Sequence, residues 1–322
     1  MSKSKAVITK EYKNIRSSRM ITAIKKLDEE LETAIEGQFG HTVIIRCGGV
    51  TIRNTELDCE FSTSFDDNTQ ADEAEITIYN LSDLTINQFV NKAKISITAG
   101  YGKDTGVIFD GYVTSKKTHR DGVDKVTVIR ALDDGKRYNQ SVESISYAAG
   151  TKASYILKDL CGRVGLPIAV FKVVRDYDYK DAVTVDGSLS DAIKQYATVC
   201  GVSAYVCKSK LYVRSLNDGD NTRFKLSSET GLLSVSEFEE EVSVNTPSDK
   251  EDKKSKNTEV IKGFDVEMLL QHRIQTASII ELDSMNYKGV FRVREGSHTY
   301  SGSEFKTSAK LIAYSPYNST NN

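Results

Sequence analysis

The chain has 322 residues, of which 39% are hydrophobic and 27% charged, so it is long enough for two or three globular domains and unlike a disordered or coiled-coil protein. Its 43 lysines and arginines against 45 aspartates and glutamates give a net charge of −2, which excludes the broad basic field of a DNA-coating protein. The apolar runs fall far short of the ~20 residues that span a bilayer, and no apolar leader follows Met1, so we expect a protein that stays in the cytoplasm where it is made.

Residues 1–40 are interpreted as an N-terminal extension. Between residues 15 and 35, apolar side chains recur mostly three or four positions apart with charged residues between them, which predicts an amphipathic helix. A single helix cannot bury its own apolar stripe, so it packs either on the body of this chain or on a neighbouring subunit, and both remain open. The residues that would dock it on a partner are Ile21, Ile24, Leu27 and Leu31.

Residues 41–145 change to a period of two, in which apolar or β-branched side chains alternate with polar ones. This pattern predicts half-buried antiparallel strands, interrupted by a helical turn at residues 83–90. Asp121 and Gly122 form a typical hairpin turn. So many short strands favour a β-barrel or a sandwich. The expected strands lie at residues 43–46, 50–52, 57–61, 74–79, 95–99, 107–113 and 126–130.

Residues 146–225 are expected to form a small α+β insert. One helix runs from a cap at Thr151 to Val164, and a second begins at a cap on Ser188 or Ser190 and ends before Gly201. A β-hairpin follows at residues 204–213.

Residues 226–322 return to strands, expected at residues 260–266, 278–282, 289–293 and 305–313, with a helical turn at residues 267–270. Residues 246–259 carry no large apolar side chain and predict a charged, flexible loop, because burial there cannot offset the entropy of ordering. The strand from Gly106 through Val113 to His119 has the same pattern of residue types, or rhythm, as that from Gly289 through Val293 to His298. This rhythm reflects either two copies of one β module or chance.

The search for catalytic chemistry finds no nucleophile elbow, zinc-protease motif, P-loop or Cys-x-x-Cys. The four histidines lie far apart, so we assign no metal and no cofactor. The cysteines are odd in number and scattered, which predicts buried thiols without a disulfide framework; they are Cys47, Cys59, Cys161, Cys200 and Cys207. The sequence therefore predicts a protein that is not an enzyme.

Several strand segments, in this order, resemble the baseplate or tail hub proteins of long-tailed bacteriophages, and the resemblance extends over about residues 47–316. This family includes late control protein D-like proteins of contractile phages, hubs of phage-tail-like bacteriocins and, more distantly, the hub portion of type VI secretion spikes. The segments that carry it first are Ala74-Glu-Ile-Thr-Ile-Tyr-Asn-Leu-Ser82, Lys94-Ile-Ser-Ile-Thr-Ala-Gly-Tyr101, Val107-Ile-Phe-Asp-Gly-Tyr-Val113, Asp121-Gly122 and Ala131-Leu-Asp-Asp-Gly135. Downstream, the same order continues through Thr151-Lys-Ala-Ser-Tyr-Ile-Leu157, Leu189-Ser-Asp-Ala-Ile193, Ala204-Tyr-Val206, Leu211-Tyr-Val213, Gly263-Phe-Asp-Val266, Leu269-Leu270, Arg273-Ile274 and Gly289-Val-Phe-Arg-Val293.

The resemblance implies a mainly β, α+β chain in which two tube-like antiparallel β-barrel modules flank the small insert. Three chains would form a pseudo-sixfold ring that joins the tail tube to the central spike. The implied partners are the tail tube protein, the spike protein and a baseplate wedge or tape-measure component, in a virion or tail-like particle assembled in the cytoplasm of the bacterial host. Neither a membrane nor a specific nucleic-acid sequence is expected as a partner.

Such a ring needs exposed strand edges for pairing between subunits. We expect these contacts at Ile76, Ile78, Tyr79, Ile95, Ile97, Ala99, Ile279, Ile280 and Leu282. Two other functions remain open. Tyr101, Tyr112 and Tyr138 could form a surface on which host glycans or wall polymers stack. A peptidoglycan hydrolase is the enzymatic alternative, because hub genes can be fused to such domains.

Overall fold

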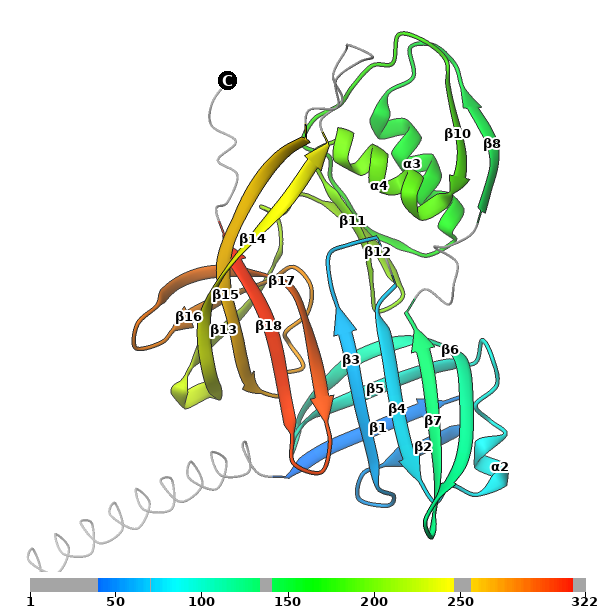
Figure 1. Ribbon diagram of the computed structural model, residues 1–322, viewed down its shortest axis with the longest axis vertical. Helices are drawn as coiled ribbons and strands as arrows, with labels where there is room; N and C mark the ends of the chain where they lie inside the picture. Colours follow the sequence, from blue (N-terminus) through cyan, green and yellow to red (C-terminus); the bar gives the residue numbers. More distant parts are fainter. Residues whose placement is uncertain (1–39, 70, 134–140, 246–255, 315–322) are drawn as a thin grey trace, which may run out of the picture.

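The computed structural model describes residues 40–69, 71–133, 141–245 and 256–314. Most strands of this described part belong to one large, largely antiparallel sheet, and two smaller sheets and two longer helices complete it (Figure 1). The mainly β, α+β class predicted from the sequence is confirmed. The predicted N-terminal helix, with Ile21, Ile24, Leu27 and Leu31, lies outside the described residues.

The first β half contains the strands and the helical turn expected between residues 41 and 145. Alternate residues of each strand are buried, as on β4, where Ala74, Ile76 and Ile78 face the core. Figure 1 shows β3, β4 and β7 crossing in front of β1, β2 and β5, so this part of the sheet folds back on itself. Its elements are β1 (His41–Cys47), β2 (Val50–Arg53), β3 (Cys59–Phe65), β4 (Glu73–Tyr79), α2 (Asp83–Ile86), β5 (Lys94–Tyr101), β6 (Asp104–Asp121) and β7 (Asp124–Leu132).

The middle region has its own apolar core between two helices and two small sheets. Gly165 ends the first helix in the left-handed conformation, with φ of 73°. Lys152 occupies the N-cap, and the Thr151 hydroxyl donates instead to the carbonyl of Ala148. The elements are β8 (Ser141–Tyr147), α3 (Ala153–Val164), β9 (Ile168–Phe171), β10 (Val183–Ser188), α4 (Leu189–Val199), β11 (Ser203–Cys207) and β12 (Lys210–Arg214). The predicted boundary between residues 145 and 146 therefore falls inside β8.

The second β half differs from the prediction at several places, and two of its strands, at residues 220–227 and 232–245, are not among those expected from the sequence. The boundary between residues 225 and 226 falls inside β13, and residues 256–259 of the predicted loop belong to β15. Residues 267–269 continue β15 instead of forming a helical turn, because Val266 and Met268 both bury their side chains in the core while their backbones pair with β18. The elements are β13 (Asp220–Ser227), η1 (Ser228–Thr230), β14 (Leu232–Asn245), β15 (Lys256–Leu269), β16 (Ser278–Asp283), β17 (Lys288–Tyr300) and β18 (Phe305–Ala313).

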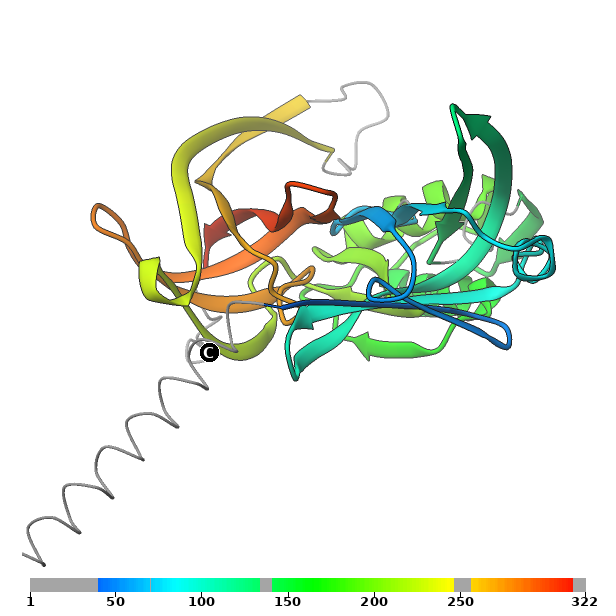
Figure 2. The same ribbon diagram turned by 90° about the horizontal axis from the view of Figure 1, so that it is seen from below.

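The large sheet is continuous across both β halves. Neighbouring strands along it run β14-β15-β18-β17-β3-β4-β7-β6-β5-β1-β2, with β16 and β13 branching from β17. Figure 2 shows the two halves side by side, with the strands of the second half curving away at one end. The contact of β17 with β3 is the only link of the sheet between the halves among the described residues, and it sets their relative position.

Candidate functional site at the junction of the two β halves

The two β halves have the same strand order. Neighbours run β3-β4-β7-β6-β5-β1 in the first half and β14-β15-β18-β17-β16-β13 in the second. The hairpin of β6 and β7 thus corresponds to that of β17 and β18, which are the stretches whose shared rhythm is visible in the sequence. The direction of one strand differs between the halves: β1 runs antiparallel to β5, whereas its counterpart β13 runs parallel to β16. One strand pattern is therefore present twice.

The registers of the two hairpins match as well. Each contains a bulge at the same place, after Val113 in the first and after Val293 in the second. Beyond the bulge, Thr118 lies opposite Thr127 with their hydroxyl oxygens 3.2 Å apart. The equivalent pair is His298 and Thr307, where Nδ1 and Oγ1 are 2.8 Å apart. Because bulges sit at defined positions and re-aim the strand that follows, this match makes the two hairpins structurally equivalent.

The junction itself is an antiparallel pairing of the last part of β17 with β3. Its register runs from Gly296 opposite Phe65 to Tyr300 opposite Phe61. A side chain at Gly296 would overlap the carbonyl of Ser308 and the Phe65 ring, so the close approach of the strands requires glycine here. The first part of β17, up to Arg292, pairs with β16 along the same edge. Along this edge β17 therefore pairs first with β16 and then with β3.

His298 occupies the centre of this junction. Its side chain is buried, and its ring centroid lies 5.0 Å from that of Phe65. Burial, with a smaller contribution from the charge of Lys208, lowers the pKa of His298 to about 3. The imidazole is therefore neutral at neutral pH and acts as a hydrogen-bonding part of the core.

An aromatic cluster closes one end of the junction. The Tyr101 and Phe305 rings meet edge to face with centroids 5.1 Å apart. The centroid of the His41 ring lies 4.4 Å from that of Phe305. Tyr101 is only 8% exposed, and its hydroxyl donates to the Phe305 carbonyl. Tyr101 is thus unavailable to stack on a glycan, which corrects that hypothesis. Tyr112 is half-buried on β6, and Tyr138 lies outside the described residues.

A buried arginine connects the three regions near the junction. Arg292 of β17 is fully buried, and its Nη1 donates to Oδ2 of Asp67 at 2.9 Å. Its Nε donates to the carbonyl of Asp218, in the segment that leaves the middle region, at 3.1 Å. From the same region, the Ser209 hydroxyl reaches the Asp110 carbonyl at 3.0 Å. Burial raises the pKa of Asp67 even though the neighbouring arginines oppose this.

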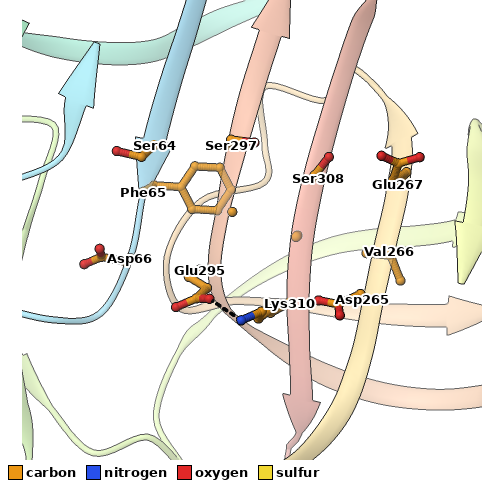
Figure 3. Close-up of a pocket in the computed structure, with 12 residues that line it drawn as sticks. Ser64, Phe65, Asp66, Asp265, Val266, Glu267, Glu295, Ser297, Ser308 and Lys310 are labelled. Carbon is orange, nitrogen blue, oxygen red and sulfur yellow. Dashed lines mark ion pairs between the residues drawn. The ribbon is translucent and has the colours of Figure 1, made fainter. Parts of the chain in front are cut away.

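One face of the junction is hollowed and acidic (Figure 3). The hollow holds about 540 Å³ and extends from β3 across β17 and β18 to β15. Lys310 and Glu295 form an ion pair of 2.7 Å within it. Burial raises the pKa of Asp66, at its rim, to about 6. Among the described residues, no three His, Cys, Asp or Glu side chains gather as metal ligands. Most of the polar side chains that line this face carry hydroxyl or carboxylate groups, so it forms a polar surface.

The residues predicted to pair between subunits occupy the core instead. Ile76, Ile95 and Ile280, with their neighbours Ile78, Ile97, Ala99, Ile279 and Leu282, are buried, and Tyr79 is half-buried. Their strands β4, β5 and β16 each have a partner on both sides. The expectation of open edges on these strands is therefore wrong, because alternation of apolar residues marks the core and not an edge. In the described part of the large sheet, open edges lie at β2, β13, β14, the last part of β6 and residues 256–262 of β15.

A mainly β chain built around a repeated strand pattern, with strand edges left open, has the features of a protein that assembles with others. The sequence model of the family described as "Baseplate hub gp41" matches residues 52–287, and the chain belongs to this family. It is therefore a structural component of a tail baseplate, as the resemblance in its sequence implied. No curated protein matches.

Solved structures share the fold at low sequence identity. A tail protein from Neisseria meningitidis MC58 is 12% identical, with a TM-score of 0.62 over 85% of this chain and 97% of that one. The 43 kDa tail protein of prophage MuSo2 from Shewanella oneidensis is 7% identical, with a TM-score of 0.60 over 85% and 98%. An E. coli component of the type VI secretion system is 9% identical, with a TM-score of 0.57 over 84% and 77%. Among the described residues, no helix is long and apolar enough to cross a membrane.

Proposed function

We propose that three copies of this chain form a ring at the distal end of a tail tube and join the tube to a central spike. The observation that carries this proposal is the repeated strand pattern, with the same order and the same bulge in both halves. Two equivalent modules in each of three chains present six similar positions to a sixfold tube and keep threefold symmetry for a spike. The role is structural, and the proposed partners are the tube, the spike and a wedge or tape-measure component of a virion or tail-like particle.

Imaging of assembled tails tests the ring. Cryo-microscopy of the tail tip should show three copies of this chain around one axis, with their six β halves at one level. Native mass spectrometry of the isolated baseplate should give three chains per particle. A single copy, or three copies whose halves lie at different levels, would contradict the proposal.

The second part of the proposal concerns the apolar stripe of residues 15–35, with Ile21, Ile24, Leu27 and Leu31, which would dock on a neighbouring baseplate component. Deletion of residues 1–36 should then leave the melting temperature of the isolated chain nearly unchanged and reduce its incorporation into tails. A matched variant with Lys25 and Lys26 changed to alanine should incorporate normally, because it keeps the stripe. A large loss of melting temperature on deletion would show that the segment packs on its own chain.

A further inference from the structure

The junction between the two halves has a vacant counterpart on the outside of the chain. In the first half, β6 corresponds to β17, and β7 is the one described strand that pairs with its residues 115–121, all of which are exposed. In the second half, β14 corresponds to β3, and among the strands that the structure describes it pairs with β15 alone. Within residues 40–69, 71–133, 141–245 and 256–314, no strand therefore occupies either position, the one beside β6 or the one beside β14. An exposed edge of this kind is a template for pairing with another chain.

The geometry points to an antiparallel pairing of the last part of β6 in one copy with β14 in the next copy, in the register of the β17–β3 junction. This inference rests on the proposed ring and names the surface that closes it. The equivalences follow from the shared bulge and from the pairing of each strand within its half. The expected opposite pairs are Lys116 with Glu239, Lys117 with Phe238, Thr118 with Glu237, His119 with Ser236 and Arg120 with Val235.

The charges on the two edges are complementary. The β6 edge carries Lys116, Lys117 and Arg120, whereas the β14 edge carries Glu237 and Glu239, followed by Glu240. Opposite charges across a strand pair stabilise it by about 0.2–1 kcal/mol each, and like charges directly opposite destabilise it. Each edge therefore repels its own copy and attracts the other edge. This favours a head-to-tail contact, which closes into a ring, over a twofold dimer.

The ion pairs that these groups already make do not compete strongly. Glu239 lies 3.0 Å from Lys262, but both side chains are more than half exposed, and an exposed pair contributes little. The Lys116 ammonium donates to the carbonyl of Ile86 at 2.6 Å, a neutral acceptor within its own half. Both residues can therefore turn toward a partner without breaking a buried ion pair.

A pair of introduced cysteines tests the register in assembled particles. Residues directly opposite on antiparallel strands have Cβ atoms about 5 Å apart, within reach of a disulfide after small adjustment. Mild oxidation of particles that contain the full chain with Thr118→Cys and Glu237→Cys should therefore produce covalent trimers on a non-reducing gel. The native thiols should stay reduced, because burial raises the pKa of Cys59 and Cys200 to about 11 and of Cys161 and Cys207 to about 12.

The matched control combines Lys117→Cys with Glu237→Cys. A shift of one residue places the two sulfurs on opposite faces of the sheet, so this variant should remain monomeric on the same gel. Monomers from the first variant, or equal cross-linking of both, would overturn the register. If cryo-microscopy of the same particles still showed a threefold ring, the proposed function would stand and this surface would be wrong.

A charge exchange tests the same contact without a new covalent bond. Lys116→Glu and Glu239→Lys should each lower incorporation into particles several-fold, because each places like charges opposite one another. The double variant should restore incorporation, since it re-creates an opposite pair. Melting temperatures of the isolated single variants should match that of the wild type, which separates assembly from folding. Loss of incorporation that the double variant does not restore would overturn the pairing of these two residues.

Discussion

His298 shows how one buried side chain couples the junction to pH. Its pKa is lowered from 6.5 to about 3 by burial, so the native chain keeps it neutral while the unfolded chain protonates it below about pH 6.5. The unfolded state then binds more protons, and the free energy of unfolding falls as the pH falls through this window. Above pH 7 both states are neutral and the effect disappears.

We therefore expect wild type to lose about 2 kcal/mol more stability between pH 7 and pH 5 than His298→Gln does, by the linkage of proton binding to folding. Urea unfolding of both proteins at the two pH values measures this difference. The comparison with the variant removes the contribution of Asp66, whose raised pKa of about 6 acts with the opposite sign. Equal pH dependence of the two proteins would show that His298 is not held neutral.

At the scale of elements, the junction depends on the close approach of β17 to β3 and β18. Gly296→Ala places a methyl group against the Ser308 carbonyl and the Phe65 ring, and neither the backbone nor a packed ring can move away easily. Such overpacking should cost about 1–3 kcal/mol. Thermal or urea unfolding of the isolated chain measures it.

The equivalent strand of the first half provides the matched control. Lys117 on β6 corresponds to Ser297, next to Gly296, and its side chain is exposed. Lys117→Ala should therefore change the stability of the isolated chain by less than about 0.5 kcal/mol. If Gly296→Ala were equally neutral, β17 and β3 would not be packed as closely as described.

At the scale of the whole molecule, Arg292 holds three regions together from a buried position. Asp67→Ala leaves its guanidinium buried without that carboxylate, and removal of one partner from a buried pair typically costs about 3–5 kcal/mol. We expect a loss near the lower figure, because Arg292 keeps its bond to the Asp218 carbonyl and Arg294 keeps its ion pair with Glu240. Differential scanning calorimetry would also show whether the three regions still unfold together.

An exposed pair in the same neighbourhood serves as the control. Lys172 contacts Asp218 at 3.0 Å, but its side chain is 69% exposed. Lys172→Ala should cost less than about 1 kcal/mol. A similar loss from both variants would argue against a special role of the buried arginine.

Local pattern alone determined the strands of the first half, β15 to β18 of the second half, the helices of the middle region and the residue pattern shared by two hairpins, because period and turn chemistry act between residues near in sequence. It also carried the family resemblance. It did not indicate β13 and β14. Tertiary structure decided which strands are neighbours: an alternating strand such as β4 reads the same whether its edges are open or paired, so the predicted contact residues proved to be core. The pairing of β17 with β3 and the burial of Arg292 join positions more than 200 residues apart, and no local signal records which distant edge or carboxylate is free to receive them.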